Sequence, residues 1–118
     1  MSATPKVNLL INQGATFRYK FTWRDVKARL IDLTGFTARM QIRSDVTSSV
    51  VLVTLTVANG GITLGNKLGT ITLFMSDANT SALTTWVKGV YDIELISPLQ
   101  EVYRLVGGTV TVSPEVTR

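Results

Sequence analysis

The sequence predicts an all-β fold made of two packed antiparallel sheets. Thr, Val and Ile supply roughly a third of the 118 residues, and β-branched side chains favour strands over helices. In several segments apolar and polar side chains alternate with a period of two, which is typical of a strand buried on one face. Turn residues recur at short intervals and leave segments of strand length between them.

Turn signals divide the chain into about eight expected strands. Asn12-Gln-Gly14 ends the first extended stretch, and Asn59-Gly60-Gly61 predicts a hairpin because asparagine and glycine reach positive φ at little cost. The glycine-bounded segment 65–69 reverses the chain again, and a proline-containing turn at 97–101 joins the last two strands. The expected strands are residues 7–11, 16–23, 37–43, 50–57, 62–64, 70–75, 89–96 and 102–118.

Side-chain alternation assigns faces to three of these strands. At 37–43, Ala38, Met40 and Ile42 share the face opposite the arginines. At 89–96, alternation puts Tyr91, Ile93 and Leu95 inward. At 16–23 it puts the aromatic side chains inward and the basic ones outward. The run at 50–57 is almost continuously apolar or β-branched, so we expect it to be buried on both faces or to lie at an interface.

One short helix is expected at residues 76–83. Ser76 suits the N-cap position and Asp77 the positive end of the helix dipole, while Ala78, Ala82 and Leu83 form a short apolar stripe. Gly107-Gly108 predicts a bulge or bend in the last strand. Together these segments predict an antiparallel immunoglobulin-like β-sandwich of about eight short strands with one short helix. We expect an extended N-terminal arm, residues 1–12, followed by a single domain, residues 13–118.

Composition argues against several kinds of chemistry. Histidine and cysteine are absent, which removes imidazole and thiol nucleophiles, disulfides and the usual zinc ligands. Neither glycine pair lies between a strand and a substantial helix, so a phosphate-binding loop is not expected. No apolar run resembles a signal peptide or a membrane span. We therefore predict no catalytic, cofactor or metal site, no membrane association, and synthesis in a reducing cytoplasm.

Charged residues are unevenly distributed along the chain. Residues 1–43 contain eight basic and two acidic side chains. The aromatic strand at 16–23 interleaves these basic residues with rings, but alternation favours a core strand with a solvated outer face over a nucleic-acid surface. Asp92 and Glu94 could supply paired carboxylates or hold a hard cation, yet cross-strand pairing with Arg39, Arg43 or Arg104 is favoured. Any nucleic-acid binding should be weak and sensitive to salt.

Exposed apolar strands invite strand addition by a partner, and two segments offer more apolar strand than a small sandwich needs. We expect the N-terminal arm to dock on another molecule and the basic outer positions to contact an acidic protein surface. The expected partner-binding residues are Val7, Leu9, Leu10, Ile11, Val51, Val53, Arg18, Lys20, Arg39 and Arg43.

The two closing strands, Gly89-Val-Tyr-Asp-Ile-Glu-Leu95 and Gly108-Thr-Val-Thr-Val-Ser-Pro-Glu-Val-Thr-Arg118, carry a family resemblance. With Asn12-Gln-Gly-Ala-Thr-Phe17 and the segment Ile31-Asp-Leu-Thr-Gly-Phe, which precedes the strand at 37–43, the chain resembles small β-rich structural proteins encoded among the tail and receptor-binding genes of tailed bacteriophages and prophages. Asn59-Gly-Gly-Ile-Thr-Leu64 and Gly69-Thr-Ile-Thr-Leu73 continue the same order.

The resemblance implies a virion component present in many symmetric copies and bound to other virion proteins. A tail or baseplate component, or an adaptor that joins the tail to fibres or spikes, is the first expectation. A capsid decoration protein is the alternative. A carbohydrate-binding module ranks last, since such modules expose aromatic side chains in loops. Only Phe36, Trp86 and Tyr103 are candidates here, and Trp86 is expected to plug the end of a sheet instead.

Overall fold

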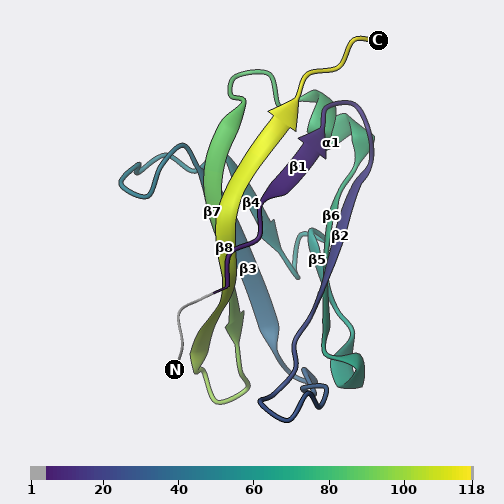
Figure 1. Cartoon of the computed structure of the whole chain (residues 1–118), viewed down its shortest axis with the longest axis vertical. Helices are drawn as coiled ribbons and strands as arrows, with labels where there is room; N and C mark the ends of the chain where they lie inside the picture. Colours follow the sequence, from purple (N-terminus) through teal and green to yellow (C-terminus); the bar gives the residue numbers. More distant parts are fainter. Residues whose placement is uncertain (1–4, 118) are drawn as a thin grey trace.

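Two β-sheets packed face to face form the architecture of residues 5–117, the part of the chain that this computed structural model describes (Figure 1). The predicted all-β sandwich of eight strands is therefore confirmed. Beside the strands lie a 3-10 turn, η1 (Asn66–Leu68), and a single helical turn, α1 (Asp77–Ser81). The strands are β1 (Leu9–Asn12), β2 (Phe17–Thr22), β3 (Thr37–Arg43), β4 (Val53–Thr56), β5 (Ile62–Leu64), β6 (Thr70–Met75), β7 (Lys88–Ile96) and β8 (Val102–Ser113).

The larger sheet has five strands in the order β1-β8-β7-β3-β4, and the smaller has three in the order β2-β6-β5. All neighbouring strands are antiparallel except β1 and β8, which are parallel, so the expectation of purely antiparallel sheets is wrong at this edge. This arrangement brings the first and last strands of the chain together at one edge of the larger sheet (Figure 1).

The core lies between the sheets and follows the expected alternation. Tyr91, Ile93 and Leu95 of β7 are buried, and β3 contributes Ala38, Met40 and Ile42 from the next strand. Because side chains of a strand point alternately to its two faces, the intervening positions form the outer face of the five-stranded sheet. The strand and face assignments for residues 37–43 and 89–96 are confirmed.

The aromatic strand β2 also turns its rings inward, opposite buried residues of β6. Phe17 is buried, whereas Tyr19 remains 39% exposed because β2 is an edge strand and only β6 pairs with it. On the outer face, the Arg18 guanidinium lies 5.1 Å from the centre of the Phe74 ring. The predicted solvated basic face is confirmed, whereas the core assignment holds for Phe17 alone, with Phe21 half-buried and Tyr19 exposed.

The N-terminal segment differs from the expected arm. Residues 9–12 form β1 and pair with β8 over four registered positions. Leu9 and Ile11 are only 3% and 1% exposed, so they belong to the core of this domain. Apolar side chains at every second position supply the face that the five-stranded sheet buries here. The predicted division into an arm at 1–12 and a domain at 13–118 was therefore wrong for residues 9–12, which belong to the domain. Residues 1–4 of the predicted arm lie outside the described part.

Two further expectations need correction. The run at 50–57 forms only the short strand β4, and Val50 is 64% exposed, since its amide bonds to the Ser48 hydroxyl rather than to a sheet. The bulge in β8 lies at Leu105, between the pairs Ile93 to Val106 and Glu94 to Arg104. The predicted cap of α1 is confirmed, because the Ser76 hydroxyl accepts a hydrogen bond from the Asn79 amide at 3.1 Å.

Candidate functional site

The outer face of the five-stranded sheet carries a row of charged side chains that cross three strands. The Arg39 Nε of β3 lies 2.8 Å from a carboxylate oxygen of Glu94 on β7, and the Arg104 Nε of β8 lies 3.7 Å from Asp92. The predicted cross-strand pairing of the two carboxylates is confirmed for Arg39 and Arg104. Opposite charges on neighbouring strands stabilise a sheet modestly, so these carboxylates have a structural use.

Arg43 does not join these ion pairs. Its guanidinium donates to the Gln41 side-chain oxygen at 2.8 Å and to the Ser48 backbone oxygen at 2.7 Å. Both partners are neutral, so the positive charge of Arg43 is not balanced by a carboxylate among residues 5–117. The expectation that Arg43 pairs with Asp92 or Glu94 is thus wrong, because Arg43 stands opposite Val90 in the strand register.

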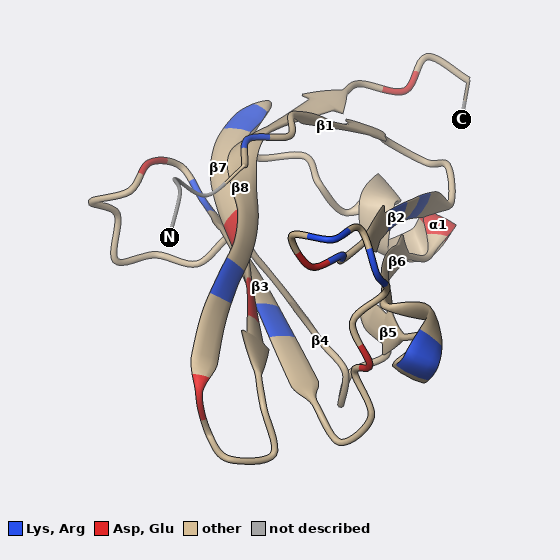
Figure 2. Cartoon of the chain, turned by 60° about the horizontal axis from the view of Figure 1, so that its bottom comes forward, with Lys and Arg blue, Asp and Glu red and all other residues tan. Residues whose placement is uncertain are grey.

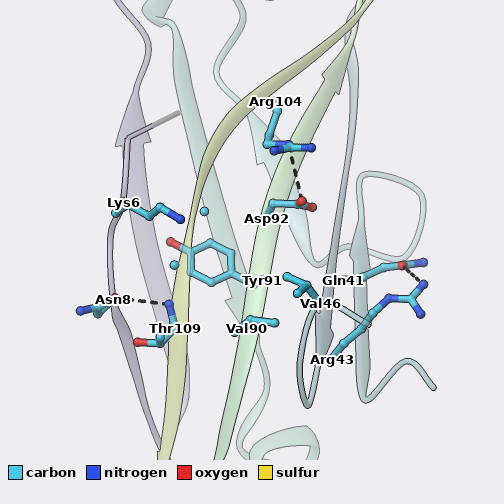
Figure 3. Close-up of a pocket in the computed structure, with 12 residues that line it drawn as sticks. Lys6, Asn8, Gln41, Arg43, Val46, Val90, Tyr91, Asp92, Arg104 and Thr109 are labelled. Carbon is cyan, nitrogen blue, oxygen red and sulfur yellow. Dashed lines mark hydrogen bonds and ion pairs between the residues drawn. The ribbon is translucent and has the colours of Figure 1, made fainter. Parts of the chain in front are cut away.

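A groove with a volume of about 400 Å³ opens on this face where β8 approaches the N-terminal segment (Figure 3). In the register of the sheet, Gly107 faces outward between Lys6 and Asp92, and Gln41 follows on β3. Glycine leaves a gap in the layer of outward side chains at this position. The residues that line the groove are Lys6, Asn8, Gln41, Arg43, Val46, Val90, Tyr91, Asp92, Arg104, Gly107, Gly108 and Thr109.

Backbone hydrogen bonds build the wall of the groove that the N-terminal segment provides. The Val7 amide donates to the Gly107 oxygen at 2.8 Å, and the Gly107 amide donates to the Pro5 oxygen at 3.0 Å. One strand position further, the Thr109 amide donates to the Asn8 side-chain oxygen at 3.3 Å (Figure 3). These contacts hold Lys6 and Asn8 beside β8 with both side chains exposed.

Tyr91 anchors this wall from the inside of the sandwich. Its hydroxyl donates a 2.6 Å hydrogen bond to the Val7 oxygen, and its side chain is 5% exposed. Burial, together with the nearby phenol of Tyr19, raises the pKa of Tyr91 to about 12. Tyr91 is therefore neutral at physiological pH and serves as a hydrogen-bond donor, not as a base.

The loop at 44–49 forms the opposite wall. The Asp45 carboxylate accepts hydrogen bonds from the Thr47 hydroxyl at 2.6 Å and from the Thr47 amide at 2.8 Å. These bonds lower the pKa of Asp45, because they stabilise its charged form. The loop carries Val46 at its tip, where the side chain is 86% exposed beside the groove.

The expected partner-binding residues do not form one surface. Leu9 and Ile11 lie in the core and Val7 packs against it, whereas Leu10 points outward and is 56% exposed. Of the second apolar segment, Val51 is half-buried and precedes β4, and Val53 packs against the core.

The four basic residues of the expected partner surface lie on opposite faces of the sandwich. Arg18 and Lys20 belong to β2 of the three-stranded sheet, and Arg39 and Arg43 belong to β3 of the five-stranded sheet; the basic positions of both strands are blue in Figure 2. In each strand these residues alternate with inward ones, so they lie on the outer face of their own sheet. These four residues therefore do not share one outer face. Spacing within each strand indicated the outward positions, but it could not indicate to which sheet each strand belongs.

Sequence reasoning missed the residues at the centre of the groove, namely Lys6, Asn8, Gly107 and Thr109. The glycine pair in an otherwise β-branched strand was the available signal, since glycine in a strand often marks a close approach of another backbone. A methyl group at Gly108 would collide with the Val7 carbonyl. The pair therefore admits the N-terminal segment, and the bulge lies elsewhere.

The aromatic candidates for a sugar platform are divided between two places. Trp23 packs against Phe36 with ring centres 6.4 Å apart and against Tyr103 at 5.6 Å, and all three side chains are half-buried. Trp86 is also half-buried and lies over Gly89, as a plug at the end of a sheet would. These rings contribute to packing, so they do not form an exposed stacking surface.

No protein-family model matches the chain, and no curated protein matches its sequence. Within residues 5–117, no three residues among Asp and Glu gather closely enough to hold a metal ion. The same residues contain no helix with the length and apolar character needed to cross a membrane.

Proposed function

We propose that the protein is a non-enzymatic structural component of a bacteriophage virion, most specifically a tail or baseplate component or an adaptor that joins the tail to fibres or spikes. The observation that supports this proposal is where the fold places the closing motif, the segments 89–95 and 108–118 that carry the family resemblance. Its strands are β7 and β8, the third and second strands of the five-stranded sheet. Tyr91, Ile93 and Leu95 fill the core, while Asp92 and Glu94 pair with arginines on the outer face.

The division of the motif between core residues and paired surface charges favours an interaction protein over an enzyme. The two carboxylates lie beside arginines of neighbouring strands, and the face that they share is polar and partly open to solvent. A surface of this kind suits attachment to other proteins in a symmetric assembly. The protein would be made in the host cytoplasm and incorporated into the particle in many copies.

We also infer an immunoglobulin-like sandwich of the variable type. The order β8-β7-β3-β4 corresponds to strands G, F, C and C′ of that fold, and β2-β6-β5 corresponds to B, E and D. Two features of antibody domains are missing from the sequence. The chain has no cysteine for the disulfide between the sheets, and Met40 takes the place of the buried tryptophan at the core position of β3. The strand order supports the inference, and apolar packing takes the place of the disulfide.

The location of the protein in particles tests the proposal. Particles of the phage that encodes the chain would be purified on a density gradient and labelled with an antibody to this protein for electron microscopy. We expect label at the tail or baseplate in several copies per particle. Label on the head lattice would favour the capsid decoration alternative. Absence of the protein from intact particles would contradict a virion function.

A further inference from the structure

The groove on the outer face exists because one outward strand position has no side chain. In the register of the sheet, Gly107 lies between Lys6 and Asp92. The next outward positions of β8, Arg104 and Thr109, bound the gap along the strand, and both are labelled in Figure 3. The groove therefore reaches the backbone of β8. Its volume of about 400 Å³ lies within the range of roughly 300–1,000 Å³ that is typical of ligand sites.

The charge of the groove favours an anionic group. Three lining side chains, Lys6, Arg43 and Arg104, are basic, and only Asp92 is acidic. Arg104 and Asp92 are separated by 3.7 Å with side chains 61% and 48% exposed, so their pairing is loose and partly solvated. A guanidinium has five N–H donors, and a carboxylate ligand matches its geometry.

The neutral residues of the groove indicate a peptide as the anionic ligand. Asn8, Gln41 and Thr109 offer amide and hydroxyl groups that both donate and accept, as a peptide backbone requires. Val46 and Val90 add apolar contacts beside them. An extended peptide whose side chains alternate between acidic and apolar would contact both the polar and the apolar residues of the groove.

A nucleic-acid strand fits this groove less well. Single strands bind through aromatic rings on which bases stack, and Tyr91, the one aromatic residue of the lining, is committed to the Val7 oxygen and buried. A peptide backbone also offers N–H groups for which Asp92 can serve as an acceptor, whereas a phosphodiester backbone offers no donor.

We propose that this groove binds an acidic peptide segment of a partner protein, with a ligand carboxylate above Gly107 between Lys6 and Arg104. That the partner is a virion protein rests on the proposed function. The groove would thus supply an attachment point on the outer face of the five-stranded sheet, formed jointly by the two ends of the chain.

Peptide binding to the isolated protein tests the proposal. The probe is a fluorescein-labelled peptide of alternating glutamate and valine, measured by anisotropy at physiological salt. We expect saturable binding that the double variant Lys6→Gln/Arg104→Gln weakens about tenfold, since charge-assisted hydrogen bonds to a carboxylate are lost. The matched control is Arg18→Gln/Lys20→Gln, which removes the same charge from the opposite face and should change affinity less than about twofold.

Amide chemical shifts locate the peptide on the ¹⁵N-labelled protein, with the largest changes expected at Gly107, Gly108 and Thr109. Equal weakening by both double variants, shifts centred on another face, or tighter binding of an oligothymidylate or oligogalacturonate of equal charge would overturn the proposal. If the groove double variant has a lowered melting temperature, the peptide affinity of the single variant Lys6→Gln, at an exposed position, is compared with the control instead.

Failure of this inference and failure of the proposed function are distinguishable. Peptide binding in the groove by a protein that is absent from particles would overturn the virion function and leave the groove assignment intact. A protein present in particles that does not bind the peptide would overturn the groove assignment alone.

Discussion

The hydroxyl of Tyr91 reaches across the sandwich edge and donates a 2.6 Å hydrogen bond to the backbone oxygen of Val7, 84 residues earlier in the chain. This bond ties strand β7 to the segment that leads into β1. Gly108 lies opposite Tyr91 in the register of β7 and β8 and leaves room for the Val7 carbonyl. The Tyr91 hydroxyl thus holds the N-terminal segment in the sheet, and Gly108 leaves the space that this segment needs to form the wall of the groove.

Deletion of residues 1–11 should unfold the protein rather than release a stable domain. The deletion removes Leu9 and Ile11, both almost fully buried, and exposes the edge of β8. Loss of one such side chain costs about 2–5 kcal/mol, and a domain of this size has about 5–15 kcal/mol of stability. Circular dichroism should show no cooperative melt. The control is Leu10→Ala, at a 56% exposed position of β1, which should melt close to the intact chain.

Stability should fall between pH 10 and pH 12 because of Tyr91. Its pKa is about 12 in the folded protein, raised by burial, against 10.0 in an unfolded chain. The folded state therefore keeps its proton when the unfolded state loses it, and the contribution present below pH 10 is lost as pH rises through 12. The melting temperature of the wild type should exceed that of Tyr91→Phe by a margin that shrinks between pH 10 and pH 12.

The difference between the two proteins isolates Tyr91, since lysines and the exposed phenol of Tyr19 are common to both. At neutral pH, Tyr91→Phe should be less stable by about 1 kcal/mol, because the Val7 oxygen loses its donor. A constant difference from pH 8 to pH 12 would show that the phenol titrates normally and that the hydrogen bond is not maintained in solution.

The substitution Gly108→Ala should detach the N-terminal segment from β8. A methyl group at this position would collide with the Val7 carbonyl, and the backbone of Val7 cannot move without losing its bond to Gly107. Hydrogen exchange of the Val7 amide should accelerate to the rate of an exposed amide. The control is Gly60→Ala, at φ +81 with open space around the added carbon. It should lower stability by about 1–2 kcal/mol and leave Val7 protected.

Alternation along the sequence was sufficient to predict the inner faces of β3 and β7, because the period of two is a local property. The ion pairs of Asp92 and Glu94 followed from the same rule, since the outward positions of neighbouring strands meet. The pairing of β1 with β8 could not be predicted in this way. Asn8 and Thr109 are 101 residues apart, and nothing within residues 7–11 says which strand they join.

The groove was unpredictable for the same reason. It depends on Lys6, Gly107 and Asp92 standing in one row across the N-terminal segment, β8 and β7, and that row exists only once the register is known. Likewise, the basic residues of β2 and β3 have the same local pattern but lie on opposite outer faces. Local chemistry identified the outward positions, and long-range strand order decided which of them became neighbours.

Core packing and surface charge on β7 should contribute very differently to the free energy of unfolding. Ile93→Ala should lower the free energy of unfolding by about 2–5 kcal/mol, because this side chain is fully buried between the sheets. Glu94→Gln should cost within about 1 kcal/mol, since its partner Arg39 is 55% exposed and water screens the pair. A double-mutant cycle with Arg39→Gln in urea should give a coupling of about 0.2–1 kcal/mol.

Calcium supplies the decisive control for these carboxylates. Two carboxylates on one strand face could hold a hard cation, and binding would stabilise the folded state in proportion to occupancy. With Asp92 paired to Arg104 and Glu94 to Arg39, millimolar calcium should leave the melting temperature unchanged. If calcium raises it, and Asp92→Asn/Glu94→Gln abolishes the increase without loss of fold, the carboxylates form a cation site and the structural account of this face is wrong.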